Sequence, residues 1–256
     1  MPATGYSQGA KYSKGANTRE RILRAAERQF AAHGYDGVSA RRIAAAANVQ
    51  LALLSYYFGS KLGLYRAVFQ RRIDPISERR LDILRRVMRR VDPPPSIEEV
   101  LDALARPWVE LRDEPGGEHY SRLIAREVGD PREGERGIVK QMLDPVALEF
   151  LGAMERTLPG LPRAEIHWAY YFFIGALLLV LANPKRMQRL SGDLCDADDS
   201  QAVISQIVDF SLKALKDRER VALRERKESS HEVGHLRSGR RKSAQRRLDR
   251  PRSKAG

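Results

Sequence analysis

The sequence predicts an all-α fold, and three observations support this prediction. Apolar residues recur at helical spacing along the chain, as do Ile22, Ala26 and Phe30 at positions i, i+4 and i+8. No stretch combines sustained alternation with β-branched residues, which is the pattern of a half-buried strand. Short runs rich in proline and glycine separate the periodic segments and are typical helix breaks. The 256 residues are enough to bury a sizeable core.

Four helices are expected near the N-terminus, because residues that cap or end helices stand at suitable intervals. Hydroxyl side chains accept hydrogen bonds at helix starts, and glycine or asparagine adopts the left-handed conformation that ends a helix. The third helix spans about Gln50 to Tyr57, and the fourth turns Leu64 and Val68 inward. The residues that cap or end these helices are Thr18, Gly34, Ser39, Asn48, Gly59 and Ser60.

Residues 91–96 must interrupt any helix, because three consecutive prolines supply no backbone N–H. Beyond them the apolar spacing predicts helices near 97–111, 118–128, 135–158, 163–182 and 198–216. The longest uncharged stretch, Trp168 to Ala182, has 15 residues and is shorter than the roughly 20 that span a bilayer. A buried core or interface helix is therefore expected there, and no membrane partner.

Charge divides the chain into three parts. Residues 1–90 hold 18 Lys and Arg against 6 Asp and Glu, and residues 91–215 hold 13 against 21. Residues 216–256 hold 15 against 6. A basic front can bind a polyanion that an acidic middle would repel, so the two parts are expected to have different partners. The single cysteine, Cys195, excludes an internal disulfide and suits a reducing, cytoplasmic location.

Two short helices joined by a tight turn, Ser39–Ala47 and Gln50–Tyr57, predict a helix-turn-helix. In such motifs the second helix enters the major groove of DNA, and Gln50 can pair bidentately with adenine. Tyrosine hydroxyls next to Phe58 can reach phosphates, and a helix start at Ser60 attracts phosphate. The residues expected to contact DNA are Ser39, Arg41, Arg42, Gln50, Leu51, Ala52, Ser55, Tyr56, Tyr57 and Lys61.

Residues 18–69, with "HGYDGVS", "RRIAAAANV", "YYFGSK" and "LYRAV" in this order, resemble the N-terminal domain of TetR-family transcriptional regulators. "YSRLIAREVGDP" and "LDPVALEFLGAM" are similar to the CecR-like subgroup. The resemblance implies a helix-turn-helix domain followed by a helical domain for ligand binding and dimerisation. It also implies a phosphate-binding role for Lys61 and for Tyr56 or Tyr57. Asn48 stands where the family has a turn glycine, and Gln50 is a poorer cap than the usual residue.

Composition and the resemblance together predict four regions, and the resemblance implies a homodimer. These are a flexible arm (1–17), a helix-turn-helix domain (18–65), an effector-binding and dimerisation domain (66–216) and a basic, disordered tail (217–256). Subunits would pair through the helices near 163–182 and 198–216. A small effector would bind the second domain and shift the two DNA-binding domains apart. Candidate pocket residues are Trp108, Tyr120, Arg126, His167 and Tyr171, although Arg126 and Glu127 are read first as structural, each with its own partner.

The protein is therefore predicted to be a dimeric repressor that binds a palindromic operator, and not an enzyme. Its expected partners are double-stranded DNA and an unknown small molecule, and no cofactor is expected. Two alternatives stay open. One is a sequence-nonspecific DNA-coating protein, whose affinity would hardly depend on sequence. Whether or not the protein coats DNA, the basic tail adds sequence-independent DNA affinity or is simply solvated. The other is a zinc metalloprotease, because "HEVGH" at 231–235 matches H-E-x-x-H. The glycine inside this string and its charged surroundings argue against a rigid metal site.

Overall fold

The computed structural model describes residues 7–248, with side chains from residue 16 to residue 228. Within these residues every regular element is helical, as predicted. The elements are α1 (Ser7–His33), α2 (Ala40–Ala46), α3 (Leu51–Phe58), α4 (Lys61–Met88), α5 (Ile97–Arg112), α6 (Gly117–Val128), α7 (Glu133–Arg136), the π-helical η1 (Val139–Leu143), α8 (Asp144–Thr157), α9 (Arg163–Ala182), α10 (Pro184–Ser191) and α11 (Ser200–Leu248).

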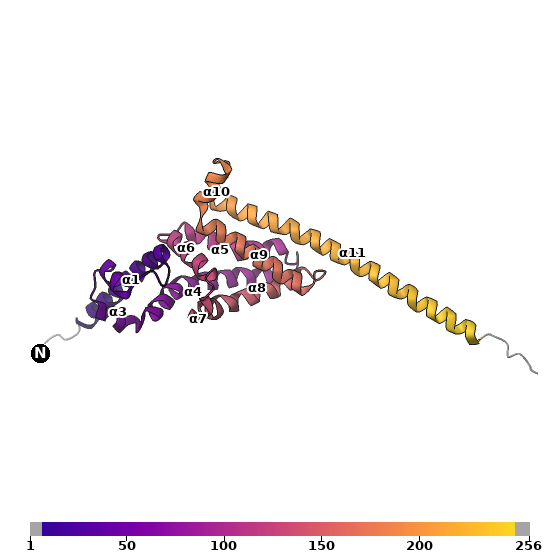
Figure 1. Cartoon of the computed structure of the whole chain (residues 1–256), viewed down its shortest axis with the longest axis horizontal. Coiled ribbons are helices and arrows are strands. Elements are labelled where there is room, and N and C mark those ends of the chain that lie inside the picture. Colours follow the sequence, from indigo (N-terminus) through magenta and orange to yellow (C-terminus); the bar gives the residue numbers. More distant parts are fainter. Residues whose placement is uncertain (1–6, 249–256) are drawn as a thin grey trace, which may run out of the picture.

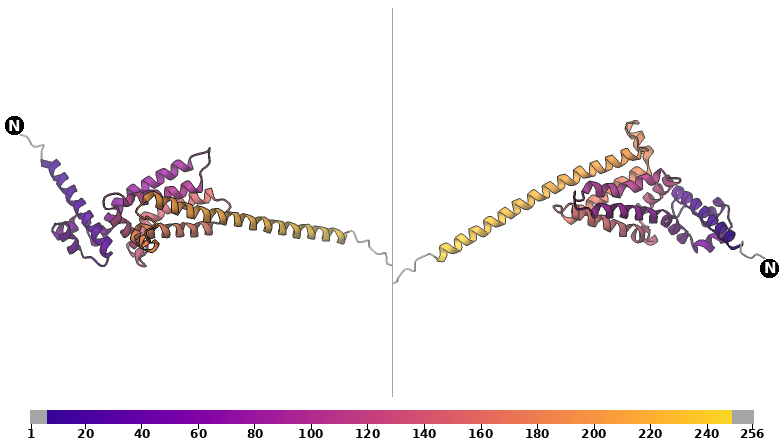
Figure 2. Two further views of the ribbon diagram at one scale, coloured as in Figure 1. Left: turned by 90° about the horizontal axis from the view of Figure 1, so that it is seen from above. Right: turned by 180° about the vertical axis from the view of Figure 1, so that it is seen from behind.

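The helices form two adjoining parts, which follow one another along the long axis of the molecule (Figure 1). We call α1 to α3 with the start of α4 the head, and the bundle of the rest of α4, α5, α6, α8, α9 and the first turns of α11 the body. Figure 1 shows the head at one end and α11 leaving the body toward the other, and both views in Figure 2 agree. The C-terminal part of α11 therefore lies far from the head.

The helix α4 connects head and body without interruption. It begins in the head, where Leu64 and Val68 are buried as expected, and continues through the body to Met88. The expected domain boundary at residue 66 thus falls inside a helix. Pro75 lies within α4 and removes one backbone hydrogen bond, which weakens the helix near the passage from head to body.

The prediction of one continuous helix over residues 135–158 is wrong. The segment is divided into α7, η1 and α8. Gly137 takes a left-handed conformation (φ 67°) that ends α7, and Pro145 at the start of α8 supplies no N–H for a regular helical bond. Conversely, no helix is expected between residues 182 and 198, but α10 forms there. Its first residue is Pro184, and proline is well accepted in the first turn of a helix.

Both terminal predictions also differ from the structure. The region expected to be a disordered tail from residue 217 continues α11 as helix to Leu248. Arg218 pairs with Glu165 at 2.6 Å, and Glu219 accepts a bond from the Gly160 N–H, so α11 packs on the body beyond the expected end at 216. Arg, Lys, Glu, Gln and Ala are good helix formers, and no proline interrupts this segment.

At the other end, α1 begins at Ser7 rather than at Thr18, so most of the expected arm is helical. Gly9 and Gly15 suggested a flexible segment. Each glycine costs a helix only about 1 kcal/mol relative to alanine, which lowers but does not forbid helix formation.

The start of α5 gives a testable pH dependence. Ser96 caps this helix in a capping box with Glu99, and Arg90 donates to both Glu99 oxygens at 2.5 and 2.6 Å. These bonds, that from Arg90 foremost, lower the pKa of Glu99 to about 2 although partial burial opposes them. A lowered folded-state pKa stabilises the fold above the unfolded value of 4.5, and this contribution disappears as pH falls toward 2.

Glu99→Gln is accordingly expected to lower the free energy of unfolding near pH 7, with a difference from wild type that shrinks between about pH 4.5 and pH 2. Urea unfolding at several pH values measures it. Glu98→Gln, at the exposed neighbouring position, controls for the loss of one negative charge. A difference that stayed constant with pH would contradict the role given to the Arg90–Glu99 pair.

Candidate nucleic-acid interface

The turn between α2 and α3 has the geometry that the sequence predicts. Asn48 takes a left-handed conformation (φ 51°), and the Val49 N–H donates to Ala44 O at 3.0 Å. Asparagine tolerates this region better than most residues with a Cβ. The turn fixes α3 against α2, which is the arrangement of a helix-turn-helix.

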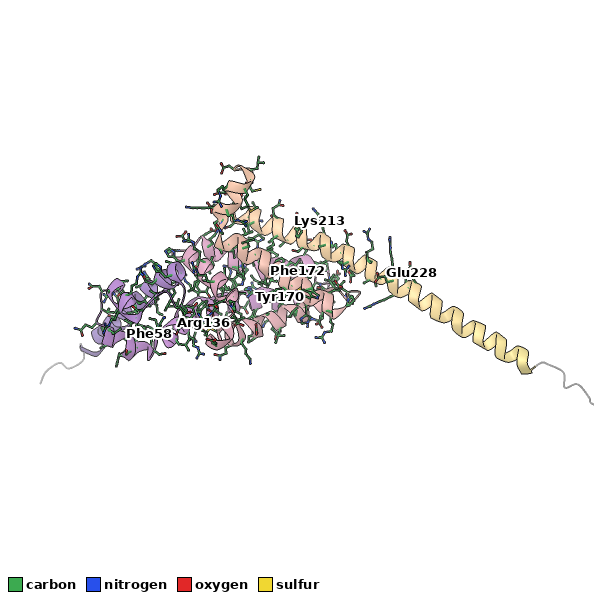
Figure 3. All side chains as sticks on the ribbon, in the orientation of Figure 1. Phe58, Arg136, Tyr170, Phe172, Lys213 and Glu228 are labelled. Carbon is green, nitrogen blue, oxygen red and sulfur yellow. The ribbon has the colours of Figure 1, made fainter. Side chains whose placement is uncertain are left out.

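A small apolar core supports the motif. Ile43 and Leu54 are buried, and Val49 and Phe58 are half-buried against the same core, as expected. The Arg19 guanidinium lies over the Phe58 ring, 5.5 Å from its centroid. Figure 3 labels Phe58 in the head. These contacts join α1 to the end of α3 and hold the outer face of α3 in place.

The start of α2 presents two arginines on the surface. The Ser39 hydroxyl accepts from the Arg42 N–H at 3.2 Å and caps the helix as predicted. The Arg42 guanidinium contacts His33 Nε2 at 2.8 Å, while the Arg41 side chain is exposed beside it. The cap and the two cations together make a surface suited to an anion.

The start of α3 is open to its surroundings. Gln50 occupies the N-cap position and makes no capping bond with its side chain, as expected for a poor cap. Leu51, Ala52 and Ser55 are also exposed, although Leu51 is a large apolar residue. The buried side of α3 rests on Leu54, so these residues form its outward face.

The three consecutive aromatic residues 56–58 differ in how far they are exposed. Tyr56 is 79% exposed, whereas Tyr57 and Phe58 are half-buried. The Tyr56 and Tyr57 rings meet edge to face with centroids 5.2 Å apart. Tyr56 thus lies on the outer surface of the head, and the half-buried Tyr57 ring packs against the Tyr56 ring.

Lys61, the expected phosphate ligand, lies in the first turn of α4. Its ammonium lies over the Tyr35 ring, 4.3 Å from the centroid. Gly59 (φ 71°) turns the chain, and the Ser60 hydroxyl accepts from the Gly63 N–H at 3.0 Å. The ring, the cap and the helix dipole place positive charge at this end of the head. The contribution of Tyr35 was not predicted, because no local pattern links it to Lys61.

A buried cluster joins the head to the body, because Tyr65 at the start of α4 contacts an ion pair between Glu127 of α6 and Arg136 of α7. Arg136 Nε donates to Glu127 at 2.8 and 3.1 Å, and the Tyr65 hydroxyl donates to Glu127 at 2.9 Å. Arg136 also pairs with Asp130, and the Arg66 guanidinium donates to Arg136 O. Burial raises the pKa of Glu127, while Tyr65 and Arg136 oppose this shift.

The neighbouring residues Arg126 and Glu127 have separate partners, as expected. Arg126 is exposed and its guanidinium lies 3.5 Å from Ala32 O in α1. Arg126 is therefore a contact between body and head rather than a pocket residue, which corrects one candidate.

The other candidate pocket residues do not come together either. The Trp108 and Tyr120 rings stack inside the body, with centroids 6.2 Å apart and planes 4° apart. His167 and Tyr171 lie on the outer surface of α9. Their aromatic or titratable character suggested a pocket, but their positions along α9 point them out of the bundle. Only the Trp108–Tyr120 pair of this set is in the interior.

An open cleft of about 830 Å³ lies where head and body meet. It is lined by charged side chains of α1 and α4, among them Arg71 and Arg72, which pair with the buried Glu27. Pro107 and Leu111 of α5 form part of its wall. Within the part of the chain whose side chains are described, no group of three His, Cys, Asp or Glu residues could hold a metal. The "HEVGH" string lies in α11, and its side chains are outside the described residues.

Family comparisons agree with this geometry. Residues 22–68 match the model of bacterial regulatory proteins of the tetR family. Residues 102–212 match the model of the tetracyclin repressor-like C-terminal domain. The chain belongs to the TetR family. Its members are DNA-binding transcriptional regulators with a ligand-binding domain, so the head is the DNA-binding domain and the body carries the ligand-binding domain.

One curated relative is a TetR-family regulator from Shigella flexneri, the HTH-type transcriptional dual regulator CecR. It is 28% identical over 137 residues, which are 52% of this chain and 61% of the relative. The chain thus spans less than two thirds of the length of that relative.

Solved structures share the fold. The fatty acid degradation regulator FadR from Bacillus halodurans superposes with a TM-score of 0.56 at 18% identity, covering 76% of this chain and 94% of its own. A complex of SmeT with triclosan gives a TM-score of 0.51 at 20% identity, covering 77% and 91%. At such identities the likeness concerns the fold alone.

The helix α9 is long and apolar enough to cross a membrane by length and composition. It packs in the body against α6, α8 and α11, as a helix of the TetR-family body. Composition alone is therefore weak evidence for a membrane span here.

Proposed function

We propose that the protein is a cytoplasmic, effector-responsive repressor that binds a palindromic operator as a homodimer. The observation that carries this proposal is the outward face of α3. Gln50, Leu51 and Ala52 are exposed at its start, and along the chain they are preceded by Arg41 and Arg42 and followed by Lys61. A glutamine at the start of a recognition helix can read adenine, and the flanking cations bind the backbone.

The dimer would form through α9 and α11. Five large apolar side chains on these helices are more than half exposed, namely Trp168, Tyr171, Phe172, Leu179 and Phe210. Exposed apolar side chains gathered on neighbouring helices are typical of a protein–protein interface. Two-fold symmetry would then present two heads to two half-sites about one helical turn apart.

The effector would act by binding the body and favouring an arrangement in which both half-sites cannot be occupied together. Such a ligand shifts the equilibrium only through its different affinity for the two arrangements. The continuous helix α4 and the hydrogen bond from Tyr65 to Glu127 support this coupling, because each joins the body directly to the head.

Gln50→Ala tests operator reading. The variant is expected to lose about 1–3 kcal/mol of discrimination at one base pair in each half-site, because it removes a bidentate base contact. Competition between the operator and single-base variants of it measures this loss.

Lys61→Ala is the matched comparison. It is expected to weaken binding about equally for all sequences and to reduce the salt slope by about 1 per head, since it removes a phosphate contact. If Gln50→Ala weakened all sequences alike, the nonspecific coating protein would be the better account.

The basic C-terminal segment was expected either to add sequence-independent DNA affinity or to be a solvated tail. The structure carries α11 away from the head (Figure 1), so this segment and α3 of one chain do not face the same side. Removal of residues 229–256 is therefore expected to leave operator affinity within a few-fold of wild type. The same truncation removes "HEVGH" and would abolish a protease activity that depended on it.

A further inference from the structure

The helix α4 carries a buried arginine, Arg80, into the centre of the body. This residue is 3% exposed, and its guanidinium carbon lies 5.5 Å from the centroid of the Trp108 ring and 4.9 Å from that of Phe150. The Arg80 guanidinium donates a hydrogen bond to the Tyr170 hydroxyl of α9. Arg80 thus lies where α4, α5, α8 and α9 meet, in the interior that Figure 3 marks with Tyr170.

Arg80 keeps its positive charge in this apolar site. Burial lowers its pKa to about 10, and Tyr170 partly opposes the shift, so the guanidinium is protonated at neutral pH. No carboxylate pairs with it among the residues whose side chains are described. The nearest comparison is Arg136, which is equally buried but is paired with Glu127 and Asp130. A buried cation without an anion is costly, and proteins ordinarily pair such charges.

Three buried polar atoms around Trp108 also lack a hydrogen-bond partner. They are Arg80 Nε, Ser77 Oγ and the Tyr120 hydroxyl. Ser77 is three residues before Arg80 on α4, so the two side chains are neighbours on one face of the helix. Tyr120 stacks on the Trp108 ring. Arg80 Nε and Ser77 Oγ can each donate a hydrogen bond, which makes this face of α4 complementary to a negatively charged acceptor.

The cleft between head and body reaches close to this cluster. Ile76, one turn before Arg80 on the same face of α4, lines the cleft. Leu111, one turn after Trp108 on α5, lines it too, together with Pro107. Residues one helical turn from Arg80 and from Trp108 thus form part of the cleft wall.

We propose that Arg80 binds the carboxylate of an effector whose remaining part is apolar or aromatic and packs between Trp108, Phe150 and Tyr170. This proposal rests on the proposed function, because it names the chemical class that the effector-binding body recognises. The aromatic residues supply apolar surface, and Arg80 with Ser77 supplies donors for the acid. An uncharged ligand of the same shape would leave the guanidinium unpaired.

The position of Arg80 also connects the effector to DNA. Lys61 and Arg80 lie on the same helix, 19 residues apart, which is about 28 Å along its axis. Pro75 lies between them, near the cleft. An acid bound at Arg80 must displace side chains packed against α4, and a shift of α4 moves Lys61 with it.

The experiment compares carboxylic acids with their primary amides, which have nearly the same shape but no charge. Octanoate, phenylacetate and benzoate are each titrated against the corresponding amide. The chain has two tryptophans, so Trp168→Phe leaves Trp108, beside Arg80, as the sole tryptophan emitter. At least one acid is expected to change Trp108 emission and to bind about 10- to 100-fold more tightly than its amide.

Arg80→Met should abolish this preference, because methionine fills similar space without charge. Arg85→Met is the matched control, since Arg85 lies on the same helix, is more than half exposed and pairs with Asp82 on the surface. The control is expected to keep the preference for the acid. Arg80→Met is also expected to have a higher melting temperature than wild type without ligand, because an unpaired buried charge has been removed.

Three outcomes would overturn the proposal: equal binding of acids and amides to wild type, an effect of the whole panel that Arg80→Met leaves intact, and a large fall in melting temperature in Arg80→Met. The last result would make Arg80 a structural residue. Operator binding by the same preparation is measured separately. Failure there with acid preference retained would contradict the proposed regulator and not the acid site.

Discussion

Phe172→Glu is expected to convert the dimer to a monomer and to lower operator affinity by about 100-fold or more. Phe172 is 65% exposed and lies between Trp168 and Leu179 along α9. Its ring stacks with that of Trp168, with centroids 5.6 Å apart. A carboxylate at the centre of a dimer interface would be buried without a partner, which costs several kcal/mol per subunit. Analytical ultracentrifugation gives the oligomeric state, and binding to operator DNA gives the affinity.

Leu190→Glu is the control for this substitution. Leu190 is 71% exposed on α10, outside the patch on α9 and α11, and the same residue is introduced. It is expected to leave the dimer and operator affinity unchanged. A Phe172→Glu protein that remained dimeric would place the subunit interface elsewhere, and with it the spacing of the two heads.

Arg136→Met is expected to lower the free energy of unfolding by about 3–5 kcal/mol, because it leaves the Glu127 carboxylate buried without its cation. Glu127 is 1% exposed, and its remaining strong partner would be the Tyr65 hydroxyl. The loss should loosen the contact between head and body, since Glu127, which accepts from Tyr65 at the start of α4, loses the cation that holds it in place. Urea unfolding measures the stability.

Arg132→Met is the matched comparison, because Arg132 forms an ion pair with Asp36 that is more than half exposed on both sides. Surface pairs of this kind contribute about 0–1 kcal/mol. If the two variants lost equal stability, burial would not be what makes the Arg136–Glu127 pair important.

The head could be predicted from sequence because its signals are local. Ser39 and Ser60 are caps, and Asn48 and Gly59 have the turn conformations that such residues favour. The apolar stripe of α1 fixes which face is buried. These features depend on residues within a few positions of each other, so the helix-turn-helix and its outward side chains follow from them.

The junction and the interior of the body depend on contacts between distant residues. Tyr65 and Glu127 are 62 positions apart, and no periodicity links Arg80 to Tyr170. The candidate pocket was chosen by residue type, so it combined the interior Trp108 with the surface residues His167 and Tyr171. The helical C-terminal segment was missed because low apolar content was read as disorder, although its residues are good helix formers.

The central claim is operator-specific binding through α3, and binding to a DNA fragment with the protein's own promoter tests it most directly. The purified protein is titrated against this fragment and scrambled DNA at two salt concentrations, with footprinting of the bound site. We expect a two-fold symmetric footprint and an affinity for the operator about 10³-fold or more above that for scrambled DNA. Binding is expected to weaken at the higher salt concentration. Equal affinity for scrambled DNA and every genomic fragment would contradict it.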